Sequence, residues 1–243
     1  MKKAYRTPGG TVYSLFRDMA EQPHLLVAGA TGSGKSVVIN GIIATLLHDS
    51  PARAQFILID PKRVELVQYK RLPHVIQYAT EPDEMPAALE TAIAITETRY
   101  QAMAKSGLRK YDGAQVYVII DELADLMTTQ KRAVMPRIQR LAQIGRAAGV
   151  HIIAATQCPL AAVIPTPIKV NFDSRVALRT SCAQDSRNIL GITGCECLPR
   201  YGQGLYRTPE GLTRYNIPMI PESEISALCK YWQGPRGRAR WII

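Results

Sequence analysis

Short apolar runs alternate with longer segments of helical periodicity along most of the chain. Four apolar runs rich in β-branched residues predict buried strands, at residues 25–28, 55–59, 117–120 and 150–156. Between them, apolar side chains recur at helical spacing after residue 36 and again from residue 85 to 103, a stripe that we attribute to core packing. Strands that alternate with helices predict a doubly wound, mainly parallel α/β sheet.

The pattern changes toward the carboxyl end of the chain. Residues 202–207 and 212–215 lie on either side of a turn with proline and glycine at 208–211, which predicts a C-terminal β-hairpin. Residues 222–232 then predict one last short helix.

The first predicted strand and helix enclose a glycine-rich loop that fits the P-loop pattern G-x-x-x-x-G-K-[ST] at every fixed position. Its residues are Gly29, Ala30, Thr31, Gly32, Ser33, Gly34, Lys35 and Ser36. The glycines let backbone N–H groups approach a phosphate, and the helix N-terminus adds a positive dipole. Lys35 would reach the β- and γ-phosphates, and Ser36 would ligate Mg²⁺. We therefore expect a nucleoside triphosphate and Mg²⁺ as ligands.

Polar residues follow two further strands at their carboxyl ends, where open α/β sheets bind ligands. Asp121 and Glu122 come directly after residues 117–120. Asp121 would hold Mg²⁺ through water, and Glu122 would orient and deprotonate the attacking water. Gln157 follows the strand at 150–156 and is a candidate sensor of the γ-phosphate. These residues favour hydrolysis over simple binding.

Six blocks along the chain occur together in a fixed order. They lie at residues 23–29, 60–62, 121–127, 146–151, 155–157 and 185–187. In this order they resemble the signature blocks of the FtsK/SpoIIIE motor domain, within a match that runs from about residue 12 to 206. The resemblance implies a RecA-like P-loop fold and a hexameric ring that pumps double-stranded DNA with ATP.

The resemblance also implies roles for single residues. Arg146 matches the family arginine that acts in trans as an arginine finger on a neighbouring subunit, although a helix-end arginine that interacts with the helix dipole is the alternative. Arg187 could sense nucleotide, contact DNA or pair with Asp185.

Two positions depart from the family pattern where DNA contacts are expected. Cys158 stands where relatives usually carry arginine, and Ala183 stands where they often carry lysine. Arg179 lies nearby and could replace one of these charges as a sensor or DNA contact. The sequence therefore does not identify which residues contact DNA.

We expect three parts: a lead-in segment at 1–22, a RecA-like motor domain at 23–221, and a short helix with a basic tail at 222–243. The tail carries three arginines and could bind a nucleic-acid backbone or be a solvated terminus. The chain is thus expected to be a minimal motor without the membrane and winged-helix domains of its relatives. A separate DNA-reading partner, in a mobile element or a similar setting, would then supply sequence recognition.

Composition agrees with this interpretation. The formal charge of +10 and the pI near 9.5 favour an anionic partner such as nucleic acid. Five cysteines without a signal peptide suggest free thiols and a cytoplasmic protein, and the close pair Cys195 and Cys197 lacks the second ligand pair that a zinc site needs. No run of about 20 apolar residues suggests a membrane span.

Our leading hypothesis is an ATP-hydrolysing motor that translocates double-stranded DNA as an oligomeric ring. One alternative is a protein-secretion or assembly ATPase of the same superfamily, which the uncharged Cys158 and Ala183 favour. Another is a nucleotide-gated binding module that hydrolyses ATP slowly and recruits a partner through its basic tail.

Overall fold

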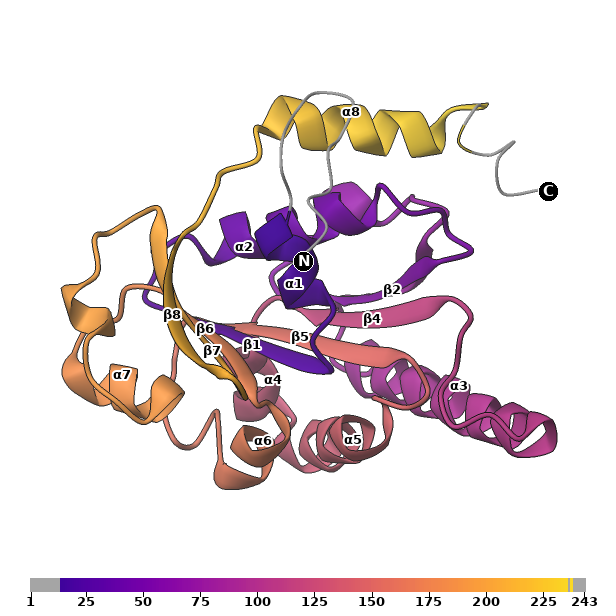
Figure 1. The fold of residues 1–243 in the computed structure, drawn as a ribbon, viewed down its shortest axis with the longest axis horizontal. Helices are drawn as coiled ribbons and strands as arrows, with labels where there is room; N and C mark the ends of the chain where they lie inside the picture. Colours follow the sequence, from indigo (N-terminus) through magenta and orange to yellow (C-terminus); the bar gives the residue numbers. More distant parts are fainter. Residues whose placement is uncertain (1–13, 236, 238–243) are drawn as a thin grey trace.

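A computed structural model describes residues 14–235 and 237, and its centre is an eight-stranded sheet within that part of the chain (Figure 1). The strand order is β3-β2-β4-β5-β1-β6-β7-β8. The strands are β1 His24–Ala28, β2 Ala54–Ile59, β3 Val75–Ala79, β4 Gln115–Ile120, β5 Val150–Thr156, β6 Ser174–Ala177, β7 Gln203–Thr208 and β8 Gly211–Asn216. All pairings are parallel except those of β7 with β6 and β8. The predicted parallel sheet and C-terminal hairpin are confirmed, and the hairpin extends one edge of the sheet.

Helices cover both faces of this sheet. Figure 1 shows α1, α2 and α8 on one face, whereas α3, α4, α5 and α6 lie on the other. The helices are α1 Ser14–Ala20, α2 Lys35–Leu46, α3 Glu84–Ser106, α4 Leu123–Thr129, α5 Lys131–Ile144, α6 Thr166–Asn171, α7 Ala183–Leu190 and α8 Glu222–Gln233, with single 3₁₀ turns at Val67–Tyr69 and Cys195–Cys197. The helices predicted after residue 36, from 85 to 103 and from 222 to 232 are confirmed as α2, α3 and α8.

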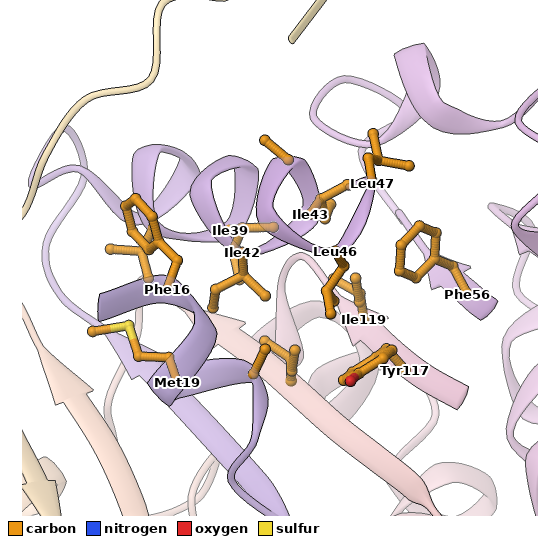
Figure 2. Close-up of a cluster of buried hydrophobic side chains, with 14 of the residues drawn as sticks. Phe16, Met19, Ile39, Ile42, Ile43, Leu46, Leu47, Phe56, Tyr117 and Ile119 are labelled. Atoms are coloured by element: carbon orange, nitrogen blue, oxygen red, sulfur yellow. The ribbon is translucent and has the colours of Figure 1, made fainter. Parts of the chain in front are cut away.

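The burial of both faces explains why the central strands are apolar at every position. Along β1, Leu25 and Val27 belong to the hydrophobic cluster under α1, α2 and α8, whereas Leu26 points to the cluster on the opposite face. Figure 2 shows the first of these clusters, in which Ile42 of α2 lies above the strands close to Phe16 and Met19 of α1.

Two strands and several short helices were not among the predicted elements. Strand β3 lies at the edge of the sheet and is only partly buried, so it lacks a continuous apolar run. Strand β6 has four residues, one of which is Arg175. Such short or edge strands carry too little periodic signal to be separated from loops.

Helices α1 and α8 both bond to the carboxyl end of α2. In α1, Arg17 donates to the Thr45 carbonyl at 3.2 Å and also pairs with Asp49 at 2.6 Å. In α8, the Trp232 indole donates to the Leu47 carbonyl at 2.7 Å. The Trp232 bond satisfies a carbonyl group that the end of the helix leaves without an intrahelical partner. The Arg17 bond adds to the one that the His48 N–H makes with the Thr45 carbonyl. The segment predicted as a lead-in therefore contains a helix that packs on the core.

The structure also bears on expectations drawn from composition. All five cysteines are unpaired. Within the described residues, no helix combines the length and apolar character needed to cross a membrane. The basic tail falls mostly at residues 236 and 238–243, which lie outside the described part of the chain.

We expect Gly41→Ala to lower the free energy of unfolding by about 1–2 kcal/mol, although alanine favours helices over glycine. Gly41 lies inside α2, and a Cβ there would meet the buried Phe16 ring at 2.4 Å. Urea denaturation measures the change. Phe16→Leu should reduce the cost of the added methyl, so the double variant should lose less stability than the sum of the two single variants. A stabilising or neutral Gly41→Ala would contradict this packing.

Candidate nucleotide site

Four parallel strands bring the predicted site residues to one edge of the sheet. Strand β5 pairs on one side with β1 and on the other with β4. The P-loop follows β1, Gln157 follows β5, and Asp121 follows β4, so these groups are neighbours although they are far apart in the sequence. Strand β2 pairs with β4 so that Ile59 lies opposite Ile120, which places Asp60 beside Asp121.

Hydrogen bonds hold the backbone of the P-loop and the side chain of its lysine in place. The Ala30 N–H donates to the Arg179 carbonyl at 2.8 Å. Gly34 has φ 104°, in the left-handed region, and is the N-cap of α2, which begins at Lys35. Lys35 is buried, and its Nζ donates to the carbonyl groups of Gly29 at 3.1 Å and Ala30 at 3.3 Å. Ser36 follows in the first turn of the same helix.

Glycine is required at the first position of this loop. A Cβ on Gly29 would lie 2.6 Å from Ser33 Oγ and 2.8 Å from Leu178 Cβ.

Burial lowers the pKa of Lys35, and the nearby carboxylates of Glu122 and Asp121 oppose this shift. An anion bound by the loop would compensate the buried ammonium in the same way.

Glu122 is a buried carboxylate held by backbone N–H groups. Its side chain is the N-cap of α4 and accepts from the Ala124 N–H at 3.3 Å. The Gln157 N–H lies 3.0 Å from Oε1 and 3.1 Å from Oε2 of Glu122. The Gln157 side-chain oxygen in turn accepts from the Thr31 hydroxyl at 2.6 Å. A continuous chain of hydrogen bonds therefore joins Glu122 to the P-loop through Gln157.

Negative charge is concentrated beside Asp121. Burial, together with the charges of Asp60, Glu65 and Glu122, raises the pKa of Asp121 to about 7, whereas Lys62 opposes the shift. Asp60 accepts from the Leu66 N–H and the Tyr78 hydroxyl through Oδ2, but its buried Oδ1 has no hydrogen-bond partner. A hard divalent cation fits these oxygen donors, because it would offset the charge that burial leaves uncompensated.

The three predicted arginines occupy different places. Arg146 lies in the turn after α5, at the amino end of β5, whereas Gln157 lies at the other end of that seven-residue strand. A strand of seven residues is about 20 Å long, so Arg146 at one end of β5 does not approach the P-loop at the other end. Arg179 lies directly after Leu178 and bonds to the P-loop only through its carbonyl group, and Arg187 lies on α7.

Two basic residues near the site had no predicted role. Lys62 Nζ lies 3.6 Å from Glu122 Oε2 and 3.7 Å from Asp125 Oδ2. Arg200 lies against the P-loop, because a Cβ on Gly32 would be 3.4 Å from its guanidinium. The signature block at 60–62 could have pointed to Lys62, but no local pattern points to Arg200.

The fold and the site define the class of protein. A P-loop after a central parallel strand, with a carboxylate pair and an amide after the next two strands, is the arrangement of a P-loop NTPase. The model of the FtsK/SpoIIIE family matches residues 7–117 and 113–161. This chain belongs to the FtsK/SpoIIIE family.

Curated relatives agree with this assignment. The DNA translocase FtsK of Chlorobaculum tepidum is 40% identical over 250 residues, which cover 93% of this chain and 31% of that protein. The DNA translocase FtsK of Caldanaerobacter subterraneus subsp. tengcongensis is 42% identical over 229 residues, covering 88% of this chain and 32% of that protein. The chain thus spans about a third of the length of these relatives.

Solved structures share the fold. The pCW3 conjugation coupling protein TcpA, in its monomer form with ATPγS, superposes with a TM-score of 0.77 at 24% identity, over 88% of this chain and 66% of TcpA. The cytoplasmic domain of the type VII secretion ATPase EccC from Thermomonospora curvata gives 0.72 at 23% identity, over 88% of this chain and 28% of EccC.

We expect the stability of the nucleotide-free protein to depend on pH through Asp121. Because its pKa is raised to about 7, the folded protein holds a proton between pH 4 and 7 that the unfolded chain has released. The free energy of unfolding therefore falls as the pH rises from about 4 to about 7. Asp121→Asn should therefore raise the free energy of unfolding relative to wild type at pH 8, and the difference should shrink toward pH 5. Urea denaturation in magnesium-free buffer tests this, and a difference independent of pH would contradict it.

Proposed function

We propose that this chain is an ATP-hydrolysing motor of the FtsK/SpoIIIE type that translocates double-stranded DNA as a hexameric ring. The observation that carries the proposal is the chain of contacts from the P-loop through Gln157 to the buried Glu122. The relatives named DNA translocase FtsK and the positive net charge support DNA as the substrate.

Each residue at the sheet edge has a role in this proposal. The P-loop backbone and Lys35 bind the phosphates of ATP, and Ser36 with Asp121 would hold Mg²⁺, which neutralises phosphate charge when bound. Glu122 orients a water molecule and accepts its proton. Gln157 contacts the γ-phosphate and connects the P-loop to Glu122.

Oligomerisation would complete the site. Arg146 lies at the amino ends of the central strands and the P-loop at their carboxyl ends. Arg146 would therefore stabilise transition-state charge only in a neighbouring subunit. A head-to-tail ring provides such a contact at each interface. Arg179 and Arg187 remain candidates for nucleotide or DNA contacts, whereas Cys158 and Ala183 carry no charge.

The cellular setting is part of the proposal. A DNA-reading partner would direct the motor. Unpaired cysteines agree with a cytoplasmic site of action.

A second candidate is a protein-secretion ATPase. The uncharged Cys158 and Ala183 weaken the case for DNA, and the fold is shared with the secretion ATPase EccC. A polypeptide substrate would then replace DNA in the ring.

We expect long duplex DNA of arbitrary sequence to raise steady-state ATPase activity at low salt, and moderate salt to reduce this stimulation, because phosphate contacts release counterions. Lys35→Ala should abolish turnover. Glu122→Gln should retain binding of an ATP analogue but slow turnover by about 10²–10⁴-fold. Basal hydrolysis without stimulation at either salt would support the secretion candidate, and normal turnover in Glu122→Gln would reject its role as the base.

Complementation between two inactive variants tests Arg146. We expect Arg146→Ala to lower turnover by about 10³-fold or more when it is assayed alone. Mixing it with Lys35→Ala should restore activity, because in a random 1:1 ring about a quarter of the interfaces join an intact P-loop to an intact Arg146. A mixture as inactive as its components would contradict action in trans, and so would an active Arg146→Ala protein.

A further inference from the structure

Lys62 contacts the carboxylate that is proposed to activate water. It follows β2 in the loop beside the carboxyl end of β4, and its Nζ lies 3.6 Å from Glu122 Oε2. Asp125, in the first turn of α4, provides a second anchor at 3.7 Å. The lysine therefore bridges two acidic side chains on the segment that carries Glu122.

The Glu122 carboxylate has little freedom in this arrangement. Both oxygens receive the Gln157 N–H, Oε1 also accepts from the Ala124 N–H, and Lys62 lies beside Oε2. The Glu122 side chain is 3% exposed. A general base must turn a free lone pair toward the water that it deprotonates. These hydrogen bonds and the ion pair oppose such a movement.

The contact with Lys62 differs from the others because it is easily reversed. The backbone N–H groups are fixed by β5 and α4, whereas Lys62 extends from a loop and its side chain is 44% exposed. Its distances of 3.6 and 3.7 Å exceed those of a direct hydrogen bond, so the ion pairs are weak. An anion that approaches from solvent could attract the ammonium away from Glu122.

We propose that Lys62 is a positioning residue that holds Glu122 in a resting orientation and so keeps basal ATP hydrolysis slow. This inference rests on the proposed function, because it requires Glu122 to be the base. In this role Lys62 acts through Glu122 rather than on the phosphates. Its loss therefore changes kcat and leaves KM for ATP unchanged.

The test is steady-state kinetics of Lys62→Met, which keeps most of the length of the side chain and removes its charge. We expect kcat without DNA to rise about two- to fivefold, the range that a half-exposed ion pair allows, at unchanged KM. Lys62→Arg should preserve the wild-type rate. In a Glu122→Gln background, Lys62→Met should have no effect, because the restrained group is gone.

Arg63→Gln is the matched control. It removes one positive charge from the same loop, but Arg63 pairs with Glu81 and does not contact Glu122. Its kcat should equal that of wild type. An equal rise in Arg63→Gln would show a general charge effect and overturn the proposal, as would a Lys62→Met rate at or below that of wild type in a protein with unchanged thermal stability.

The failure of this inference differs from the failure of the proposed function. If Glu122→Gln abolishes turnover but Lys62→Met does not raise it, only the role of Lys62 is lost. If Glu122→Gln hydrolyses ATP normally, both assignments fall.

Discussion

The parallel pairing of β5 with β1 on one side and β4 on the other places the P-loop, Gln157 and Glu122 next to one another. It aligns the carboxyl ends of the three strands, and it sets Gln157 between the P-loop and Glu122. The backbone N–H of Gln157 then reaches the carboxylate, and its side chain reaches Thr31. The site is therefore a product of strand register, because a slip of one residue would turn these side chains to other faces.

The same sheet concentrates charge that is costly to bury. Lys35, Asp60 and Glu122 are all buried, and Asp60 and Glu122 both act on the charge of Asp121. Burial lowers the pKa of Lys35 and raises that of Asp121, so both ionised forms are disfavoured without a ligand. The protein thus carries a locally unfavourable arrangement that phosphates and a cation would relieve. Such a conflict between stability and activity is typical of active sites.

Much of this arrangement could be predicted from sequence because its signals are local. The P-loop is a contiguous motif, and the strands before Gly29, Asp121 and Gln157 are uninterrupted apolar runs. The contact of Lys62 with Glu122 could not be predicted, since it depends on the pairing of β2 with β4. Arg200 reaches the P-loop from a loop that is distant in sequence, and short strands such as β6 have no periodic pattern.

Helix α2 connects the nucleotide site to both ends of the described chain. It begins at Lys35, and its last turn receives hydrogen bonds from α1 through Arg17 and from α8 through Trp232. Figure 1 shows α1 and α8 next to this helix on the same face of the sheet. A displacement of α1 or α8 would therefore act on the carboxyl end of the helix whose amino end forms part of the phosphate-binding loop. A domain or partner attached at the termini could alter nucleotide affinity without touching the nucleotide.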